Sequence, residues 1–256
     1  TAFGRRAGGV GPDARRGGSG QTTGVAVEAE ERDERRREER RLTERLLEEV
    51  GRRPRLAWVE ERELARAVRS GLEAAARLRA VDDPDRRGRL AELVRHGTEA
   101  KHELVAAHLP LVVETAERYT SSRLPFLDLF EAGSLGLVDA AERFDWYGWE
   151  PFATAAAWWI RRAIGREVRA SGPDLAVQDT SAAALDAVLA AADLDAVMAA
   201  ARVLPPRDRE VLLRCQGLDG GPVEPIETVA RRLGLTVDEA VAAEARAVQT
   251  LARAAD

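Results

Sequence analysis

Apolar residues recur every three to four positions along most of the chain, which is the spacing of one helix face. Between residues 61 and 78 this spacing predicts a buried face made of Leu64, Ala67, Val68, Leu72 and Ala75. Similar spacing continues through residues 88–120, 125–144 and 151–170. Sustained alternation of β-branched and polar residues, which would indicate strands, is not found. The sequence therefore predicts an all-α fold.

The C-terminal part predicts three helices in a particular order. A helix begins at Arg207, a Gly/Pro-rich break follows at residues 217–225, and a short helix covers residues 226–233 before Gly234. Thr236 and Glu239 then form the pattern of a capping box at the start of the last helix. Helix, Gly-containing turn and helix is the helix-turn-helix layout, although any two short packed helices can imitate it.

Composition divides the 256 residues into segments. Residues 1–43 are a predicted disordered and charged extension, with too few apolar residues in 1–27 to form a core and mixed charges afterwards that suit a solvated helix. Residues 171–201 are small and acidic, which predicts a linker followed by a weakly amphipathic helix. The predicted domains are therefore 44–170 and 202–256.

Several kinds of chemistry are not expected. One cysteine and three histidines without metal-ligand spacing predict no disulfide framework and no metal site. The sequence has no pattern of a nucleophile paired with a base, and it has no phosphate-binding glycine loop. Neither an enzyme nor a cofactor is therefore predicted. A membrane-spanning apolar run and a signal peptide are also lacking, and this predicts a cytoplasmic protein.

Aromatic residues are concentrated in one place. Ten of the twelve lie between Tyr119 and Trp159, and arginines alternate with them. Aromatic rings stack on unpaired bases and arginines neutralise phosphates, so the combination suits single-stranded or melting DNA. The alternative for Phe144, Phe152 and Trp158 is an ordinary place in the core.

These residues carry a resemblance to a known family. The segments "LPLVVETAERYTSSRLPFLDLFEAGSLGLVDAAERFDW" and "FATAAAWWIRRAI" resemble region 2 of the bacterial sigma-70 family of RNA polymerase initiation factors. The segment "LLEEVGRRPRLAWVEERELARAVRSGLEAAARL" is similar to region 1.2 of that family, and residues 202–256 are similar to region 4. The family's three-helix third domain has no counterpart, and residues 171–201 resemble the region 3.2 linker.

The resemblance implies partners and site residues. Core RNA polymerase would bind through its β′ coiled coil, and the β flap, an activator or an anti-sigma factor are further candidates. The implied contacts to the β′ coiled coil are Leu127, Asp128, Glu131 and Ser134. The implied contacts to promoter DNA, chiefly the non-template −10 strand, are Phe144, Asp145, Trp146, Tyr147, Trp149, Phe152, Thr154, Trp158, Trp159, Arg161, Arg162 and Arg166.

The chain departs from the family at informative positions. Ala155 replaces a base-stacking tyrosine, Arg162 replaces a glutamine, and Gln216 replaces a ring implied in the β flap contact. Because arginine pairs bidentately with guanine, Arg162 predicts a changed base preference at the upstream edge of the −10 element. The last helix has lost most of its cations, which makes direct −35 readout unexpected. Its degenerate reading positions are Val237, Glu239, Val241 and Ala242, with Arg246 beyond them.

Two functional hypotheses remain open. The first is an alternative sigma factor that binds core polymerase, recognises promoters and melts the −10 element, as a nucleoid-associated protein. The second is a sigma-like regulator or activator-dependent adaptor that binds polymerase but melts promoters poorly. A free-standing helix-turn-helix repressor is a weaker third, because the last helix lacks base-reading residues.

Overall fold

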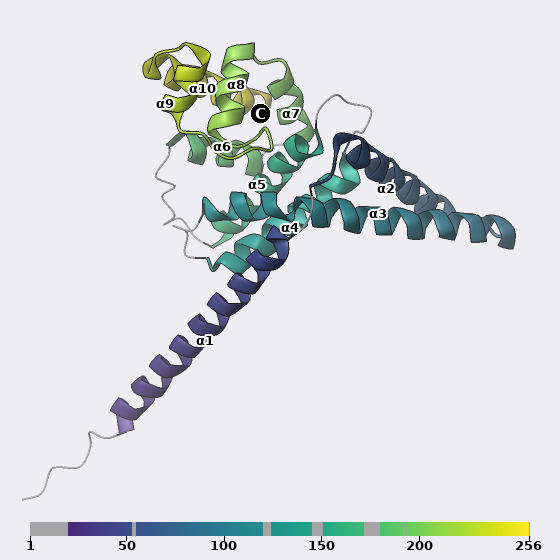
Figure 1. Cartoon of the computed structure of the whole chain (residues 1–256), viewed down its shortest axis with the longest axis horizontal. Helices are drawn as coiled ribbons and strands as arrows, with labels where there is room; N and C mark the ends of the chain where they lie inside the picture. Colours follow the sequence, from purple (N-terminus) through teal and green to yellow (C-terminus); the bar gives the residue numbers. More distant parts are fainter. Residues whose placement is uncertain are drawn as a thin grey trace, which may run out of the picture. The chain divides into compact units, whose positions relative to one another are not determined.

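A computed structural model of the chain describes residues 20–52, 55–119, 124–144, 151–171, 180–191 and 193–255 (Figure 1). Every regular element in these ranges is an α-helix, so the predicted all-α fold is confirmed for the part of the chain that is described. None of these helices is long and apolar enough to cross a membrane. The chain divides into two compact units, Thr1–Glu44 and Arg45–Asp256.

The first unit contains most of a long helix, α1 (Gly20–Gly51). Between residues 34 and 44 the side chains that are described lie exposed or half-buried, as expected for a helix with mixed charges on its surface. The sequence predicts disorder for residues 1–27 and a solvated helix after them. In the structure residues 20–27 are already helical. Residues 1–19, which belong to the predicted disordered extension, lie outside the described residues.

In the second unit, α2 (Trp58–Leu78) and α3 (Pro84–Glu117) lie side by side (Figure 1). Their backbones approach at two glycines, since a Cβ added to Gly97 would lie 2.7 Å from the Cα of Gly71. Of the predicted face, Val68 is buried and Leu64 packs against the core, but Leu72 is exposed, and the close approach buries small residues beside Val68. The buried residues of α2 are Ala65, Val68, Gly71 and Ala74.

Glycines also bring α4 (Phe126–Arg143) and α5 (Phe152–Ala170) together. A Cβ on Gly136 would lie 2.6 Å from the carbonyl oxygen of Trp159, so this contact is backbone against backbone. The two helices begin after Pro125 and Pro151, as the sequence predicts. This packing fixes the position of α5, which carries most of the candidate site.

For residues 171–201 the sequence predicts a linker followed by a weakly amphipathic helix, and the described part of this segment contains two helices, α6 (Thr180–Ala191) and α7 (Leu194–Arg202). Helix α6 packs against α5 and against the last helix, and α7 packs against the last helix. Leu185, Val188 and Leu189 are buried at helical spacing, and the same holds for Leu194 and Val197 of α7. A few leucines and valines on one face are enough to bury an otherwise alanine-rich helix.

The C-terminal helices are α8 (Pro206–Cys215), α9 (Ile226–Leu233) and α10 (Val237–Ala255). The predicted capping box is confirmed, because the amide of Thr236 donates to Glu239 at 2.8 Å and the amide of Glu239 donates to the Thr236 hydroxyl at 3.2 Å. Gly234 ends α9 with a φ of 66°, a conformation that favours glycine. The helix-turn-helix order of the sequence is therefore present.

One apolar core runs through most of the second unit. It joins residues of α2 to α5, such as Leu104 and Ile160, with residues of α6, α7 and α10, such as Leu185 and Leu251. A smaller core lies within α8, α9 and α10. The segments predicted as separate domains therefore share an interior, and α6 and the turn after α8 lie against α5.

Candidate nucleic-acid interface

The predicted −10 contacts begin at the end of α4 and continue along α5. Asp145, Trp146, Tyr147 and Trp149 lie outside the described residues. Phe144 follows the last turn of α4, is half-buried, and meets Phe152 edge to face with ring centroids 5.3 Å apart. The aromatic contact between α4 and α5 is therefore an internal one.

Three predicted DNA contacts of α5 lie in the interior of the described structure. Phe152 and Trp158 are 1% and 2% exposed, and both belong to the large apolar core. The hydroxyl of Thr154 donates to the carbonyl of Asp219 at 3.2 Å, beneath the turn that follows α8. Phe152 and Trp158 therefore occupy the core, which was the alternative to base stacking, and in this arrangement neither ring is available to a base.

A partly exposed cluster lies next to them around Trp159, in which Trp159 and Arg162 are half-buried and Arg143 is exposed. The guanidinium carbons of Arg143 and Arg162 lie 5.1 and 5.9 Å from the Trp159 ring centroid, and Arg166 is exposed on the following turn. We call these four residues the Trp159 patch. Burial, followed by the nearby charge of Arg166, lowers the pKa of Arg162, although Asp193 partly offsets this effect. Crowded cations on an aromatic ring are suited to bind an anion with a stacking group.

Arg143 was missed by sequence reasoning. It directly precedes Phe144 at the end of α4, and only the packing of α4 on α5 brings it to Trp159. The available signal was its place in the arginine-and-aromatic run "ERFDW".

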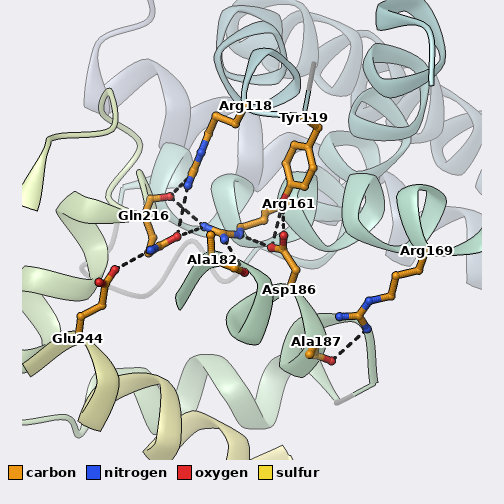
Figure 2. A network of polar contacts seen from close by, with 9 residues as sticks. All are labelled: Arg118, Tyr119, Arg161, Arg169, Ala182, Asp186, Ala187, Gln216 and Glu244. Atoms are coloured by element: carbon orange, nitrogen blue, oxygen red, sulfur yellow. Dashed lines mark hydrogen bonds and ion pairs between the residues drawn. The ribbon is translucent and has the colours of Figure 1, made fainter. Parts of the chain in front are cut away.

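Arg161, a fourth predicted DNA contact on α5 that is buried, is 1% exposed, and Figure 2 shows the residues to which it bonds. Its Nε donates to Asp186 at 2.6 Å, and its Nη1 donates to the side-chain oxygen of Gln216 at 2.7 Å. Its Nη2 donates to the carbonyl of Ala182 at 3.2 Å. These acceptors belong to α6 and to the end of α8, so the C-terminal half of the chain satisfies this guanidinium.

The polar network continues beyond Arg161 on both sides (Figure 2). Tyr119 donates its hydroxyl to both carboxylate oxygens of Asp186 at 2.9 Å, and burial raises the pKa of this phenol. Gln216 donates its amide to Glu244 of α10 at 2.6 Å, while Arg118 donates to the Gln216 carboxamide and main-chain oxygens. Gln216 therefore links α5 to α10.

Two more arginines of α5 bond to the end of α6. Arg166 donates its Nε to the carbonyl of Ala190 at 3.3 Å, and Arg169 donates to the carbonyl of Ala187 at 3.4 Å. The last carbonyls of a helix lack partners within the helix and carry partial negative charge. The end of α6 is thus a natural acceptor for these cations.

The predicted polymerase contacts lie on α4. Asp128 and Glu131 are exposed, while Leu127 and Ser134 are half-buried. Leu135 on the same helix is 64% exposed and adds an apolar side chain to this surface. The described structure thus presents a mixed acidic and apolar face on α4.

The predicted reading positions of α10 are exposed but poor in cations. Val237, Glu239, Val241 and Ala242 face solvent, and Glu239 is held by Thr236. Arg246 pairs with both oxygens of Asp208, at 2.8 and 3.1 Å. The surface offered by this part of α10 is therefore neutral to acidic.

The described residues combine an all-helical fold, a tryptophan and arginine patch and a C-terminal helix-turn-helix layout, a combination that is typical of DNA-binding proteins. The family "Sigma-70 region 2" matches residues 104–172, which include α4, α5 and the Trp159 patch. Residues 104–172 are therefore similar to region 2 of the sigma-70 family.

Curated relatives carry names of the same family. The chain is 40% identical over 126 residues to the RNA polymerase principal sigma factor HrdC of Streptomyces coelicolor, covering 47% of this chain and 37% of that protein. It is 40% identical over 126 residues to the principal sigma factor HrdD of Streptomyces griseus, covering 48% and 38%. The matched segment thus spans less than two fifths of the length of these relatives.

Proposed function

We propose that the protein is an alternative sigma factor, which binds core RNA polymerase, directs it to promoters and melts the −10 element. The observation that carries this proposal is the region 2 match together with the Trp159 patch on α5. The proposed role involves no catalysis by this chain, and it would be performed in the cytoplasm on chromosomal DNA.

In this proposal the Trp159 patch holds the upstream edge of the melted −10 region. Trp159 stacks on a base while Arg143 and Arg166 bind phosphates. Arg162 stands where the family has glutamine, and its forked guanidinium favours guanine at that edge. Residues 145–149 would hold the non-template strand, as the family resemblance implies.

Core polymerase would bind the exposed face of α4. Asp128 and Glu131 supply charge and Leu135 supplies an apolar contact. The partner is the β′ coiled coil by resemblance, and the neutral face of α10 suits a protein partner, such as an activator or anti-sigma factor, better than the −35 major groove.

One observation favours the second candidate, a sigma-like regulator that binds polymerase and melts poorly. Phe152, Trp158 and Arg161 are buried, and Ala155 occupies the position of the family's stacking tyrosine. A chain with fewer accessible stacking groups would capture the non-template strand weakly. Under this reading an activator would be required for opening.

Transcription with purified core polymerase distinguishes the two candidates. The template has a strong −10 element and no −35 element, and the products are abortive RNAs. RNA from the chain and core enzyme alone supports the sigma factor, whereas core binding without RNA supports the regulator. The polymerase contact is tested in the same assay with Glu131→Lys, expected to weaken core binding, against the control Glu103→Lys at an exposed position of α3. Failure of the chain to bind core polymerase would overturn both.

A further inference from the structure

Three arginines of α5 already have hydrogen-bond acceptors within the same chain. Arg161, Arg166 and Arg169 all donate hydrogen bonds to α6. The acceptors are one carboxylate, on Asp186, and main-chain carbonyls at Ala182, Ala187 and Ala190. Carboxylate and carbonyl oxygens satisfy guanidinium groups in the same way as phosphate oxygens do.

The covering is strongest at Arg161. A buried guanidinium is stable only when its charge is paired and its N–H groups are bonded. Asp186 supplies the charge, and Gln216 and Ala182 supply further acceptors. Removal of α6 and the end of α8 would leave this cation without those three partners, ready for another anion.

A second contact places the turn after α8 on the first turn of α5. The Thr154 hydroxyl donates to the carbonyl of Asp219, and Gly220 next to it adopts a φ of 78°. A Cβ on Gly220 would lie 2.6 Å from the Cβ of Ala153. Any side chain at this position would therefore separate the turn from α5.

We infer that α6 and residues 216–220 form an internal clamp on α5, and that the clamp and promoter DNA compete for the same arginines. The inference rests on the proposed function, since it assigns regulation to the proposed DNA surface. In the closed arrangement the Trp159 patch is the part of the described α5 surface that is open to DNA, and its Arg166 is also bonded to α6. Opening of the clamp adds Arg161 and frees Arg166 and Arg169 from α6.

Asp186→Asn tests the clamp by removing the charge that faces Arg161. Asp208→Asn is a matched control, because both carboxylates are nearly buried, at 6% and 7% exposure, and each pairs with one arginine. The Asp208 pair joins α8 to α10 and does not involve α5.

Two measurements are made on each full-length variant. Labelling by an arginine-specific dicarbonyl reagent, located by mass spectrometry, reports whether Arg161 is accessible. Fluorescence anisotropy of a labelled single-stranded −10 oligonucleotide reports affinity. We expect Asp186→Asn to expose Arg161 and lower the apparent Kd about tenfold, because apparent affinity scales with the open fraction. Asp208→Asn should change neither reading.

Gly220→Ala provides a second variant that leaves every charge in place. Its control is Gly234→Ala, which has the same kind of left-handed backbone, with a φ of 66°, and no neighbour within 4 Å of the added Cβ. Both variants incur backbone strain, but only Gly220→Ala pushes against Ala153. We expect Arg161 labelling and oligonucleotide affinity to rise in Gly220→Ala alone.

Each outcome decides the inference. If neither Asp186→Asn nor Gly220→Ala exposes Arg161, these contacts do not form a clamp and the inference is wrong. If Arg161 is exposed and the oligonucleotide binds with unchanged affinity, the clamp does not compete with DNA and the inference is also wrong. If Arg161 is exposed and no variant binds the oligonucleotide, even with core polymerase present, the proposed DNA surface is itself wrong.

Discussion

Two helices of this chain, α5 and α10, carry the residues that the sequence predicts to contact DNA, and they differ in opposite ways. On α5 the cation of Arg161 is buried, while Arg166 and Arg169 are exposed and bonded to α6. On α10 the exposed positions Val237 and Val241 carry no charge.

The difference teaches that DNA binding can be limited by two separate means. Under the proposed clamp a covered arginine becomes available to DNA when α6 leaves α5, so the proposed limit at α5 is reversible. A missing cation is fixed by the sequence, so the proposed limit at α10 remains unless a partner supplies the contact. The Trp159 patch lies between these extremes, because its cations are present and partly accessible.

The largest expected effect comes from the Trp159 patch itself. Trp159→Ala should weaken binding of a single-stranded −10 oligonucleotide by about 1–3 kcal/mol, the usual contribution of one stacked base. The control is Trp58→Ala, which removes another tryptophan with an arginine over its ring, Arg62 at 4.6 Å. Anisotropy titrations measure both. Equal losses in the two variants would remove the patch from the DNA surface.

A smaller effect is expected where α4 supports α5. Gly136→Ala places a Cβ 2.6 Å from the Trp159 carbonyl and 2.8 Å from the Ala163 Cβ. Overpacking costs about 1–3 kcal/mol, and the better helix propensity of alanine offsets about 1 kcal/mol of it. Urea unfolding should therefore show a less stable protein, and Arg143 should lose its position beside Trp159.

Gly88→Ala is the control for that change, because nothing lies within 4 Å of its added Cβ in the same type of helix. It should raise stability by about 0.5–1 kcal/mol. A Gly136→Ala protein as stable as Gly88→Ala would contradict the tight packing of α4 on α5.

The smallest effect concerns the missing charge of α10. Val241→Arg should strengthen binding to duplex promoter DNA and steepen its dependence on salt by about 0.9 in the log–log slope, as expected for one new phosphate contact. Val203→Arg adds the same charge at an exposed position outside α10 and should leave the slope unchanged. Titrations over a range of salt concentrations test this, and equal slopes for the two variants would show that α10 does not face DNA.

Local features of the fold were predictable from the sequence. The capping box of Thr236 and Glu239 and the glycine that ends α9 depend on residues close in the chain. The starts of α4 and α5 follow prolines for the same reason. Local rules therefore account for where most of these helices begin and end.

The covering of α5 was not predictable in the same way. Asp186 and Gln216 lie 25 and 55 residues beyond Arg161, so their contacts depend on the packing of the whole second unit. The sequence predicts a linker and one weakly amphipathic helix over residues 171–201 because small and acidic residues dominate the segment. The burial of Leu185 and Leu189 of α6 in the core was not predicted. A pattern of residue types identifies arginines suited to DNA but not what covers them.

Gln216 has a consequence for how binding events at distant surfaces influence one another. Its carboxamide accepts from Arg161 of α5 and donates to Glu244 of α10, because an uncharged amide can do both. Suppose that a protein binds α10 only when the hydrogen bond between Gln216 and Arg161 is broken. Under the proposed clamp, that protein would raise the affinity of α5 for DNA by some factor. Thermodynamic linkage then requires DNA on α5 to raise the affinity of α10 for that protein by the same factor.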